Sequence, residues 1–160
     1  MAAGKADPRG VIVTCPSCGQ NNRLAFGTLT KSTRCARCKN MLAAPGDPVE
    51  VTDSAAFRAA AAESSLPIIV DFWAPWCGPC RMVAPEIEKV AQGTRGRYLV
   101  LKVNTDELTD IASDYKIRSI PTLAVIFRGR ELARLAGTRS AAEIRAFADR
   151  AVTESQPRAS

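Results

Sequence analysis

The sequence predicts an α/β fold, a central mixed β-sheet flanked by helices, with a small four-cysteine domain in front of it. After residue 47, segments of strand and helix pattern alternate and end in a hairpin and an amphipathic helix. Four of the six cysteines lie in the first forty residues as two C-x-x-C pairs, which is typical of a metal-stabilised module. A Pro/Gly stretch at 43–48 separates these patterns, so the predicted domains are 1–46 and 47–160.

Composition indicates a soluble globular protein of 160 residues, 46% of them apolar and 24% charged. No apolar run approaches the ~18 residues that a membrane helix needs, so no membrane segment is expected. The first ten residues lack the apolar region of a secretory signal. A cytoplasmic protein is therefore expected, in a compartment that keeps thiols reduced.

Charge and residue usage exclude several function classes. The chain has no histidine, which excludes Cys-His hydrolases, histidine-ligated catalytic zinc and imidazole bases.

Of the formal net charge of +6, residues 1–50 carry +4, from seven Lys/Arg and three Asp/Glu. Four thiolates around one divalent metal would reduce this to about +2. A nucleic-acid partner is therefore not expected. The protein is also expected to be a monomer.

The first four cysteines form a predicted structural metal site. Cys15 and Cys18 are separated from Cys35 and Cys38 by sixteen residues, a spacing that fits one Zn²⁺ held by four thiolates. Four ligands leave no open position, so the ion would be structural, and it would supply folding free energy to a module with little core. Disulfides, an iron–sulfur cluster and a second redox pair are the alternatives; the compartment and the even pairing favour zinc.

The larger domain begins with a short strand at 49–51, a helix cap at Thr52 or Asp53 and an alanine-rich helix. Later, Ser140 and Glu143 form a capping box that opens an amphipathic helix. The other predicted elements are helix 55–63, strand 67–73, a helix beginning near Cys77, strand 97–104, helix 107–115, strands 120–127 and 131–136 joined by Arg128-Gly129-Arg130, and a frayed tail at 153–160.

Two cysteines lie where the apolar strand at 67–73 gives way to a helix, in the stretch Trp73-Ala-Pro-Trp-Cys77-Gly-Pro-Cys80-Arg81. Free N–H groups and the dipole at a helix N-terminus favour thiolate, so Cys77 is the predicted nucleophile. Cys80, one turn further, can close a disulfide with Cys77 and release a bound substrate. The alternatives are inert core cysteines or half of a metal site, but C-x-x-C at a strand–helix junction favours redox chemistry.

The segment from Val70 to Pro85 resembles the active-site segment of the thioredoxins. With the four-cysteine region in front, nearly the whole chain resembles the bacterial thioredoxin-2 type, which carries an N-terminal zinc-binding extension. The resemblance implies the thioredoxin fold and implies that Asp71 is a buried acid of raised pKa, the base for Cys80. It implies that Lys102 modulates Asp71. A satisfied polar residue at 71 and an ordinary strand lysine at 102 are the alternatives, and Trp73 is better explained by core packing.

The resemblance also implies a substrate surface beside the dithiol. Ile120-Pro121 matches the cis-proline turn that faces the active site in this fold, and it would leave the backbone of Ile120 free to pair with an extended substrate. The residues implied for substrate binding are Trp76, Gly78, Pro79, Ile120, Pro121 and Gly137.

The implied function is that of a thioredoxin, a protein-disulfide reductase that acts on oxidised protein substrates. An NADPH-dependent thioredoxin reductase would reduce the Cys77–Cys80 disulfide again, and no cofactor is expected at the redox site. Gly-Pro between the cysteines is the spacer of reducing family members. The alternative is a zinc-ribbon interaction protein whose larger domain acts as a scaffold or redox sensor; turnover of a disulfide substrate distinguishes the two.

Overall fold

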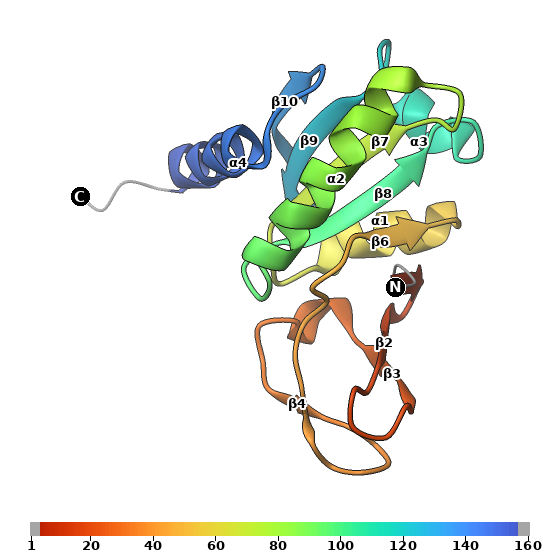
Figure 1. Cartoon of the computed structure of the whole chain (residues 1–160), viewed down its shortest axis with the longest axis vertical. Coiled ribbons are helices and arrows are strands. Elements are labelled where there is room, and N and C mark those ends of the chain that lie inside the picture. The colour runs from red at the N-terminus through yellow and green to blue at the C-terminus, as the bar shows by residue number, and fades with distance from the viewer. Residues whose placement is uncertain (1–3, 157–160) are drawn as a thin grey trace.

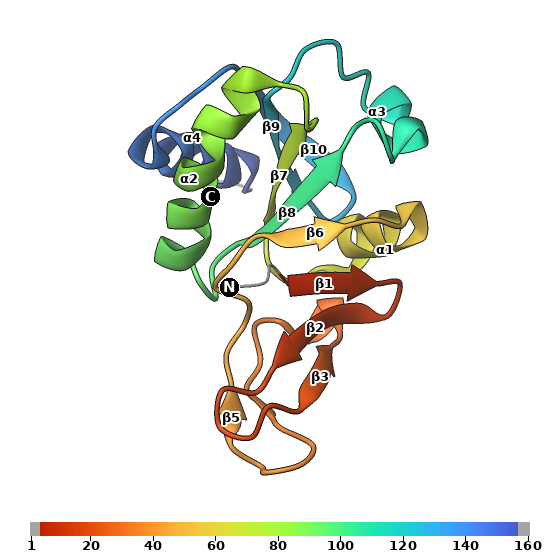
Figure 2. The ribbon, with the colours of Figure 1, turned by 45° about the vertical axis from the view of Figure 1, so that its right-hand side comes forward.

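The computed structural model describes residues 4–156, which build a mixed sheet with helices on both faces (Figure 1), and so confirms the predicted fold class. Helices α1 (Ser54–Glu63) and α3 (Thr109–Asp114) contribute to the apolar core on one face, and α2 (Gly78–Gly93) and α4 (Ala141–Ser155) to the core on the other (Figure 2). The strands are β1 (Gly4–Asp7), β2 (Gly10–Thr14), β3 (Asn21–Leu24), β4 (Thr33–Arg34), β5 (Met41–Leu42), β6 (Val49–Val51), β7 (Ile68–Trp73), β8 (Leu99–Asn104), β9 (Thr122–Phe127) and β10 (Arg130–Ala136). The helices are the 3₁₀ turn η1 (Phe26–Thr28), α1 (Ser54–Glu63), α2 (Gly78–Gly93), α3 (Thr109–Asp114) and α4 (Ala141–Ser155).

Strand β7 lies inside the main sheet, parallel to β8 on one side and antiparallel to β9 on the other. Its residues are buried on both faces up to Phe72, which explains the continuous apolar run in the sequence. Strands β9 and β10 form the predicted hairpin. Arg128 and Gly129 at its tip have φ angles of 51° and 79°, as a two-residue type I′ turn requires, and the twist of that turn matches the twist of the strands.

The N-terminal extension, residues 4–46 of the described chain, continues the main sheet. The strand order of this sheet is β10-β9-β7-β8-β6-β1-β2-β3, and β1 pairs in parallel with β6. One apolar cluster contains Val11, Leu24 and Phe26 of the extension together with Val49 and Phe57 of the larger part. The boundary at residues 46 and 47 stays a prediction from composition; sheet and core both cross it, so the two parts are physically joined.

Local signals in the larger part are confirmed, with one error at the C-terminus. Asp53 is the N-cap of α1, and Ser140 and Glu143 make both hydrogen bonds of the predicted capping box. The prediction of a frayed tail from residue 153 is wrong for Thr153 to Ser155, because α4 continues to Ser155; Val152, the residue before them, packs against the α2–α4 core. The last four residues of that predicted tail lie outside the described residues. Within residues 4–156 no helix combines the length and the apolar character that crossing a bilayer would need.

Candidate functional site

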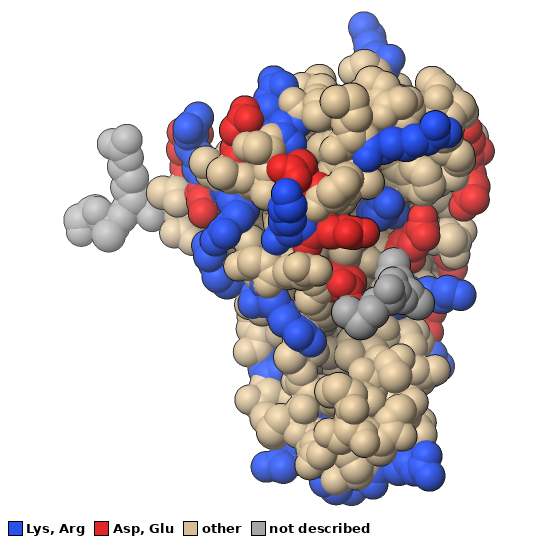
Figure 3. Space-filling view, viewed as in Figure 1, with Lys and Arg blue, Asp and Glu red and all other residues tan. Residues whose placement is uncertain are grey.

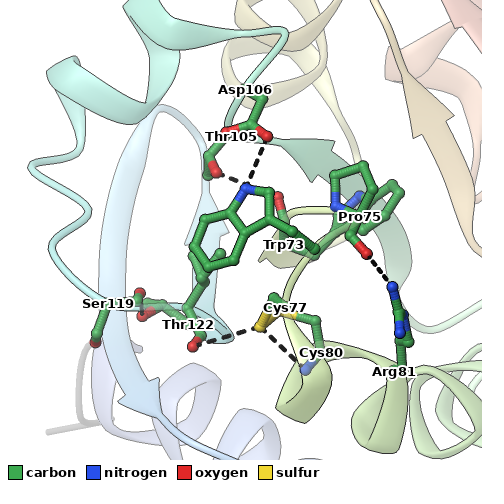
Figure 4. Close-up of a disulfide and its surroundings, with 11 residues drawn as sticks. Trp73, Pro75, Cys77, Cys80, Arg81, Thr105, Asp106, Ser119 and Thr122 are labelled. Carbon is green, nitrogen blue, oxygen red and sulfur yellow. Dashed lines mark hydrogen bonds between the residues drawn. A yellow bond between two sulfur atoms is a disulfide. The ribbon is translucent and has the colours of Figure 1, made fainter.

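The candidate site is a disulfide between Cys77 and Cys80 at the N-terminus of α2 (Figure 4). Strand β7 ends at Trp73, and a three-residue loop leads to Cys77, the N-cap of α2. The Cys77 sulfur accepts the backbone N–H of Cys80 at 3.2 Å. Pro79, in the first turn of α2, fits a position where no intrahelical donor is needed. The chain thus places one sulfur at the positive end of a helix of sixteen residues, where negative charge is stabilised.

Both sulfurs are well covered in this disulfide state. Cys77 is 4% exposed and Cys80 3%, so exposure alone does not distinguish the predicted nucleophile from the resolving thiol. The surroundings of the two sulfurs distinguish them. Cys80 lies inside the first turn of α2, whereas the Cys77 sulfur lies 3.8 Å from the carbonyl oxygen of Ile120. The two cysteines pack with Ala74, Trp73 and Ile120 in a small apolar cluster of their own.

The loop before β9 faces the dithiol. The Ile120–Pro121 peptide bond is cis, as the resemblance implies. Pro121 is buried, and its carbonyl oxygen accepts the N–H of Gly137 at 2.9 Å, which brings residue 137 to the same place. The Thr122 hydroxyl donates to the Ser119 carbonyl at 2.6 Å and closes the turn. The structure thus brings together residues 77, 120, 121 and 137, which lie up to 60 residues apart in the chain.

The outer rim of the site is apolar and exposed. Trp76 is 68% exposed, and Gly78 and Pro79 beside it are exposed as well. The Trp76 indole N–H donates to Asp106 at 2.9 Å, so the exposed ring is held in one orientation. Such a rim, next to a half-buried Ile120, can receive an extended apolar segment of another protein.

Two contacts of the active-site loop were missed from the sequence. Asp106 follows β8 and holds Trp76, and Arg81 donates to the carbonyl oxygen of Pro75 at 2.7 Å. Both residues have charged side chains of a kind common on any surface, so the sequence carried no signal for Asp106. For Arg81, the sequence showed only that it follows Cys80 and did not indicate its bond to Pro75.

Asp71 lies in the middle of β7 and is fully buried. It shares a face of the strand with Ile69, which packs against α2, the helix that carries both cysteines. No residue within 4–156 makes a hydrogen bond to either carboxyl oxygen. Burial raises the pKa of the Asp71 carboxyl to about 7, and the charge of Lys102 opposes this shift. A carboxyl group with this pKa can take up and release a proton near neutral pH.

Lys102 pairs in register with Asp71 on the neighbouring strand β8. Its ammonium group lies 4.7 Å from the centre of the Trp73 ring, a cation–π contact. Trp73 is half-buried in the small cluster with the cysteines, which agrees with the packing role expected for it. Lys102 therefore touches the ring beside the dithiol and acts on Asp71 through its charge.

The other four cysteines meet at the far end of the extension. The sulfurs of Cys15, Cys18, Cys35 and Cys38 all lie within 4.8 Å of one another. Lys and Arg side chains surround this end, and no acidic residue occurs between Asp7 and Asp47 (Figure 3). Four thiolates with one divalent cation carry a net charge of −2, which these cations offset. The predicted metal ligands therefore form one site.

Comparison with known proteins agrees with both parts of the chain. The sequence profile of the family described as "Thioredoxin" matches residues 48–150. The chain belongs to the thioredoxin family. Thioredoxin C-3 of Corynebacterium nephridii is 33% identical over 147 residues, which cover 91% of this chain and 99% of that relative. Thioredoxin 1 of a Nostoc species is 51% identical over 88 residues, 55% of this chain and 81% of that protein.

The fold agrees as well. A mutant thioredoxin from Halobacterium salinarum superposes with a TM-score of 0.61 at 27% identity, over 74% of this chain and 99% of that one. Family membership and the geometry of the Cys77–Cys80 pair together identify the activity: this thioredoxin is a dithiol–disulfide oxidoreductase.

Proposed function

We propose that this thioredoxin reduces disulfides of oxidised cytoplasmic proteins through Cys77 and Cys80. The observation that supports this proposal best is the position of the Cys77 sulfur, between the N-terminus of α2 and the carbonyl of Ile120, under an exposed rim. An extended substrate segment would pair with the backbone of Ile120 and lie on Trp76, Gly78 and Pro79, with Pro121 and Gly137 behind it.

In the reduced protein, the Cys77 thiolate attacks one sulfur of the substrate disulfide. A mixed disulfide forms, and the other substrate sulfur leaves as a thiolate that takes up a proton. Cys80 then loses its proton to Asp71, and its thiolate attacks the Cys77 sulfur. The second substrate thiolate leaves, so the substrate has gained two electrons and the protein holds the Cys77–Cys80 disulfide.

The role proposed for Asp71 depends on its burial. A carboxyl group with a pKa of about 7 is partly ionised at neutral pH and so can accept the Cys80 proton. Lys102 would modulate this group by its positive charge. An NADPH-dependent thioredoxin reductase is the proposed partner that returns two electrons to the disulfide.

The extension would hold one structural Zn²⁺. In a tetrahedral zinc–thiolate site with bonds of ~2.3 Å, neighbouring sulfurs lie roughly 3.8 Å apart. The Cys15–Cys38 and Cys18–Cys35 sulfur distances are 3.6 Å, and all four sulfurs lie within 4.8 Å, so the donor set fits this ion. Such an ion supplies folding free energy and no redox chemistry. Residues 1–46 would thus form a structural unit joined to the catalytic residues 47–160 through the sheet.

Mixed-disulfide trapping tests the division of labour between the two active-site sulfurs. Cys80→Ser should attack disulfide substrates without releasing them, giving adducts through Cys77 that survive denaturing non-reducing electrophoresis and disappear with dithiothreitol. Cys77→Ser should trap little, because the remaining thiol lies inside the first turn of α2. Equal trapping by both variants, or trapping mainly through Cys80, would reverse the assignment.

A further inference from the structure

The two halves of the metal site have the same backbone geometry, twenty residues apart. In the first, the N–H of Cys15 donates to Gln20 O at 2.8 Å, and the N–H of Gly19 to Cys15 O at 2.9 Å. In the second, the N–H of Cys35 donates to Asn40 O at 2.8 Å, and the N–H of Lys39 to Cys35 O at 3.0 Å. Gly19 and Lys39 both have positive φ angles, 79° and 66°. The site is therefore an internal repeat of two metal-binding turns.

The repeat is broken four residues after each second cysteine. That position is Asn22 in the first half, on β3, and Leu42 in the second, on β5. Both side chains are buried, Asn22 at 8% exposure. A buried amide needs hydrogen-bond partners, whereas a leucine needs none. At this position, therefore, only the residue of the first half can form a side-chain hydrogen bond with the other half.

Asn22 makes three polar contacts, one within its own turn and two with the other turn, and together they join the two turns. Its Nδ2 donates to Gln20 O at 3.1 Å in the first turn and lies 3.5 Å from the Cys35 sulfur in the second. Its Oδ1 accepts the backbone N–H of Ala36 at 3.0 Å. Since the Ala36 N–H requires an acceptor, the amide oxygen must face Ala36, and the NH₂ group then faces Gln20 and Cys35. The orientation of the side chain is thus determined by its neighbours.

We propose that Asn22 is a positioning residue for the metal ion, one that orients the second turn against the first and donates an N–H to the Cys35 thiolate. This rests on the metal site proposed above. Within residues 4–156 it is the one side chain other than the cysteines with a hydrogen bond to a ligand sulfur. Because the three contacts involve only protein atoms, they hold the four sulfurs together before the ion arrives. Preorganisation of this kind strengthens metal binding.

The contact with sulfur also has an electronic consequence. A hydrogen bond to a thiolate removes electron density from the sulfur and so changes its bond to the metal. In the repeat, Cys15 corresponds to Cys35, and Leu42 offers it no such donor. The four ligands are therefore expected to differ, with Cys35 the weakest electron donor among them.

Two substitutions and a matched control test the proposal in the full chain. Asn22→Leu installs the residue that the second half carries, makes the buried position apolar, and removes all three contacts. Asn22→Asp is nearly the same size and keeps an acceptor for Ala36, but it loses the donor and brings a negative charge to Cys35. Asn21→Leu is the control, since Asn21 is the exposed neighbour on the same strand. Its side chain accepts a hydrogen bond from Thr14, and its carbonyl oxygen accepts one from Gln20.

The first measurement is Zn²⁺ affinity, by competition with a chromophoric chelator. Asn22→Leu and Asn22→Asp should bind Zn²⁺ about 10–100-fold more weakly than the wild type, and Asn21→Leu should bind as the wild type does. The second is the absorption spectrum of the Co²⁺-loaded proteins at saturation. Loss of the N–H to sulfur should move the thiolate-to-metal charge-transfer band to lower energy in both Asn22 variants and leave it unchanged in Asn21→Leu.

The outcomes separate this inference from the metal site itself. Wild-type affinity and spectrum in both Asn22 variants would overturn the role of Asn22 while leaving the metal site in place. Weaker affinity with an unchanged Co²⁺ band would show that Asn22 only supports the local fold, and would also overturn it. A wild-type protein that gives no tetrathiolate Co²⁺ spectrum would remove the metal site and this role with it.

Discussion

Replacing Phe26 by alanine should destabilise the catalytic part of this thioredoxin together with the extension. Phe26 belongs to the extension and is 2% exposed. It shares one apolar cluster with Val49 and Phe57, and its carbonyl oxygen accepts the N–H of Ser65 at 3.0 Å. If the two parts unfold as one unit, a cavity at Phe26 must lower the free energy of unfolding of both.

The magnitude follows from the burial. Truncating a buried phenylalanine to alanine costs about 3–5 kcal/mol, from lost apolar burial and the cavity left behind. With a urea dependence of about 2 kcal/mol per M, a loss of about 4 kcal/mol lowers the unfolding midpoint by about 2 M. That is a large fraction of the ~5–15 kcal/mol that stabilises a typical domain.

The assay uses the positions of the two tryptophans. Trp73 and Trp76 are the only tryptophans in the sequence, and both lie in the catalytic part. Urea unfolding followed by tryptophan fluorescence, in reduced protein with metal, therefore reports on that part alone. Met41→Ala is the control, because Met41 lies in the extension and is 51% exposed. The urea midpoint of this variant should therefore differ little from that of the wild type. An unchanged tryptophan transition in Phe26→Ala would show that the extension unfolds independently and would refute the joint core.

Three further predictions concern the metal and two unusual residues. Removing the metal with a chelator should lower the same tryptophan transition in the wild type, because the extension shares sheet and core with the rest; an unchanged midpoint would contradict this. Asp71→Asn should stabilise the protein at pH 8 by up to roughly 4 kcal/mol and little at pH 4, measured by urea unfolding, and should slow substrate reduction above neutral pH. Lys39→Gly should raise the melting temperature of the metal-loaded protein slightly, by relieving a positive φ angle that costs roughly 1 kcal/mol, whereas Lys39→Ala should not.

The sign of the Asp71 prediction follows from linkage. The folded protein holds this proton up to about pH 7, whereas an unfolded aspartate releases it near its ordinary value of 3.8. Between these values the folded state binds more protons than the unfolded state, so wild-type stability falls as pH rises from about 4 to about 7. The asparagine variant lacks this dependence. Equal pH dependence in both proteins would show that Asp71 does not titrate as its burial implies.

Local patterns in the sequence predicted most of the catalytic part. The capping box at Ser140 and the cap at Asp53 depend on neighbouring residues only, so pattern alone was sufficient. The dithiol was predicted because its spacing and its place after a buried strand are both local. The cis bond before Pro121 came from the resemblance, since no local property selects a minority conformer.

The features that were missed join distant segments. The parallel pairing of β1 with β6 brings residues 4–5 beside residues 49–50, and neither short strand carries a signal for the other. No role was predicted for Asn22, because its contact with Cys35 exists only once both turns are folded. The bonds from Trp76 to Asp106 and from Arg81 to Pro75 likewise depend on how loops meet.

The strand β1 also has a consequence for association between molecules. Without residues 4–7, the three-residue strand β6 would be the border of the sheet, with unpaired N–H and C=O groups open to another chain. The extension moves that border outward to β3, which follows the first cysteine turn and leads directly into η1. A shortened chain starting at residue 47 should therefore be more prone to edge-to-edge aggregation than the full chain. The N-terminal segment, besides carrying the four-cysteine cluster, would then protect the solubility of the catalytic part.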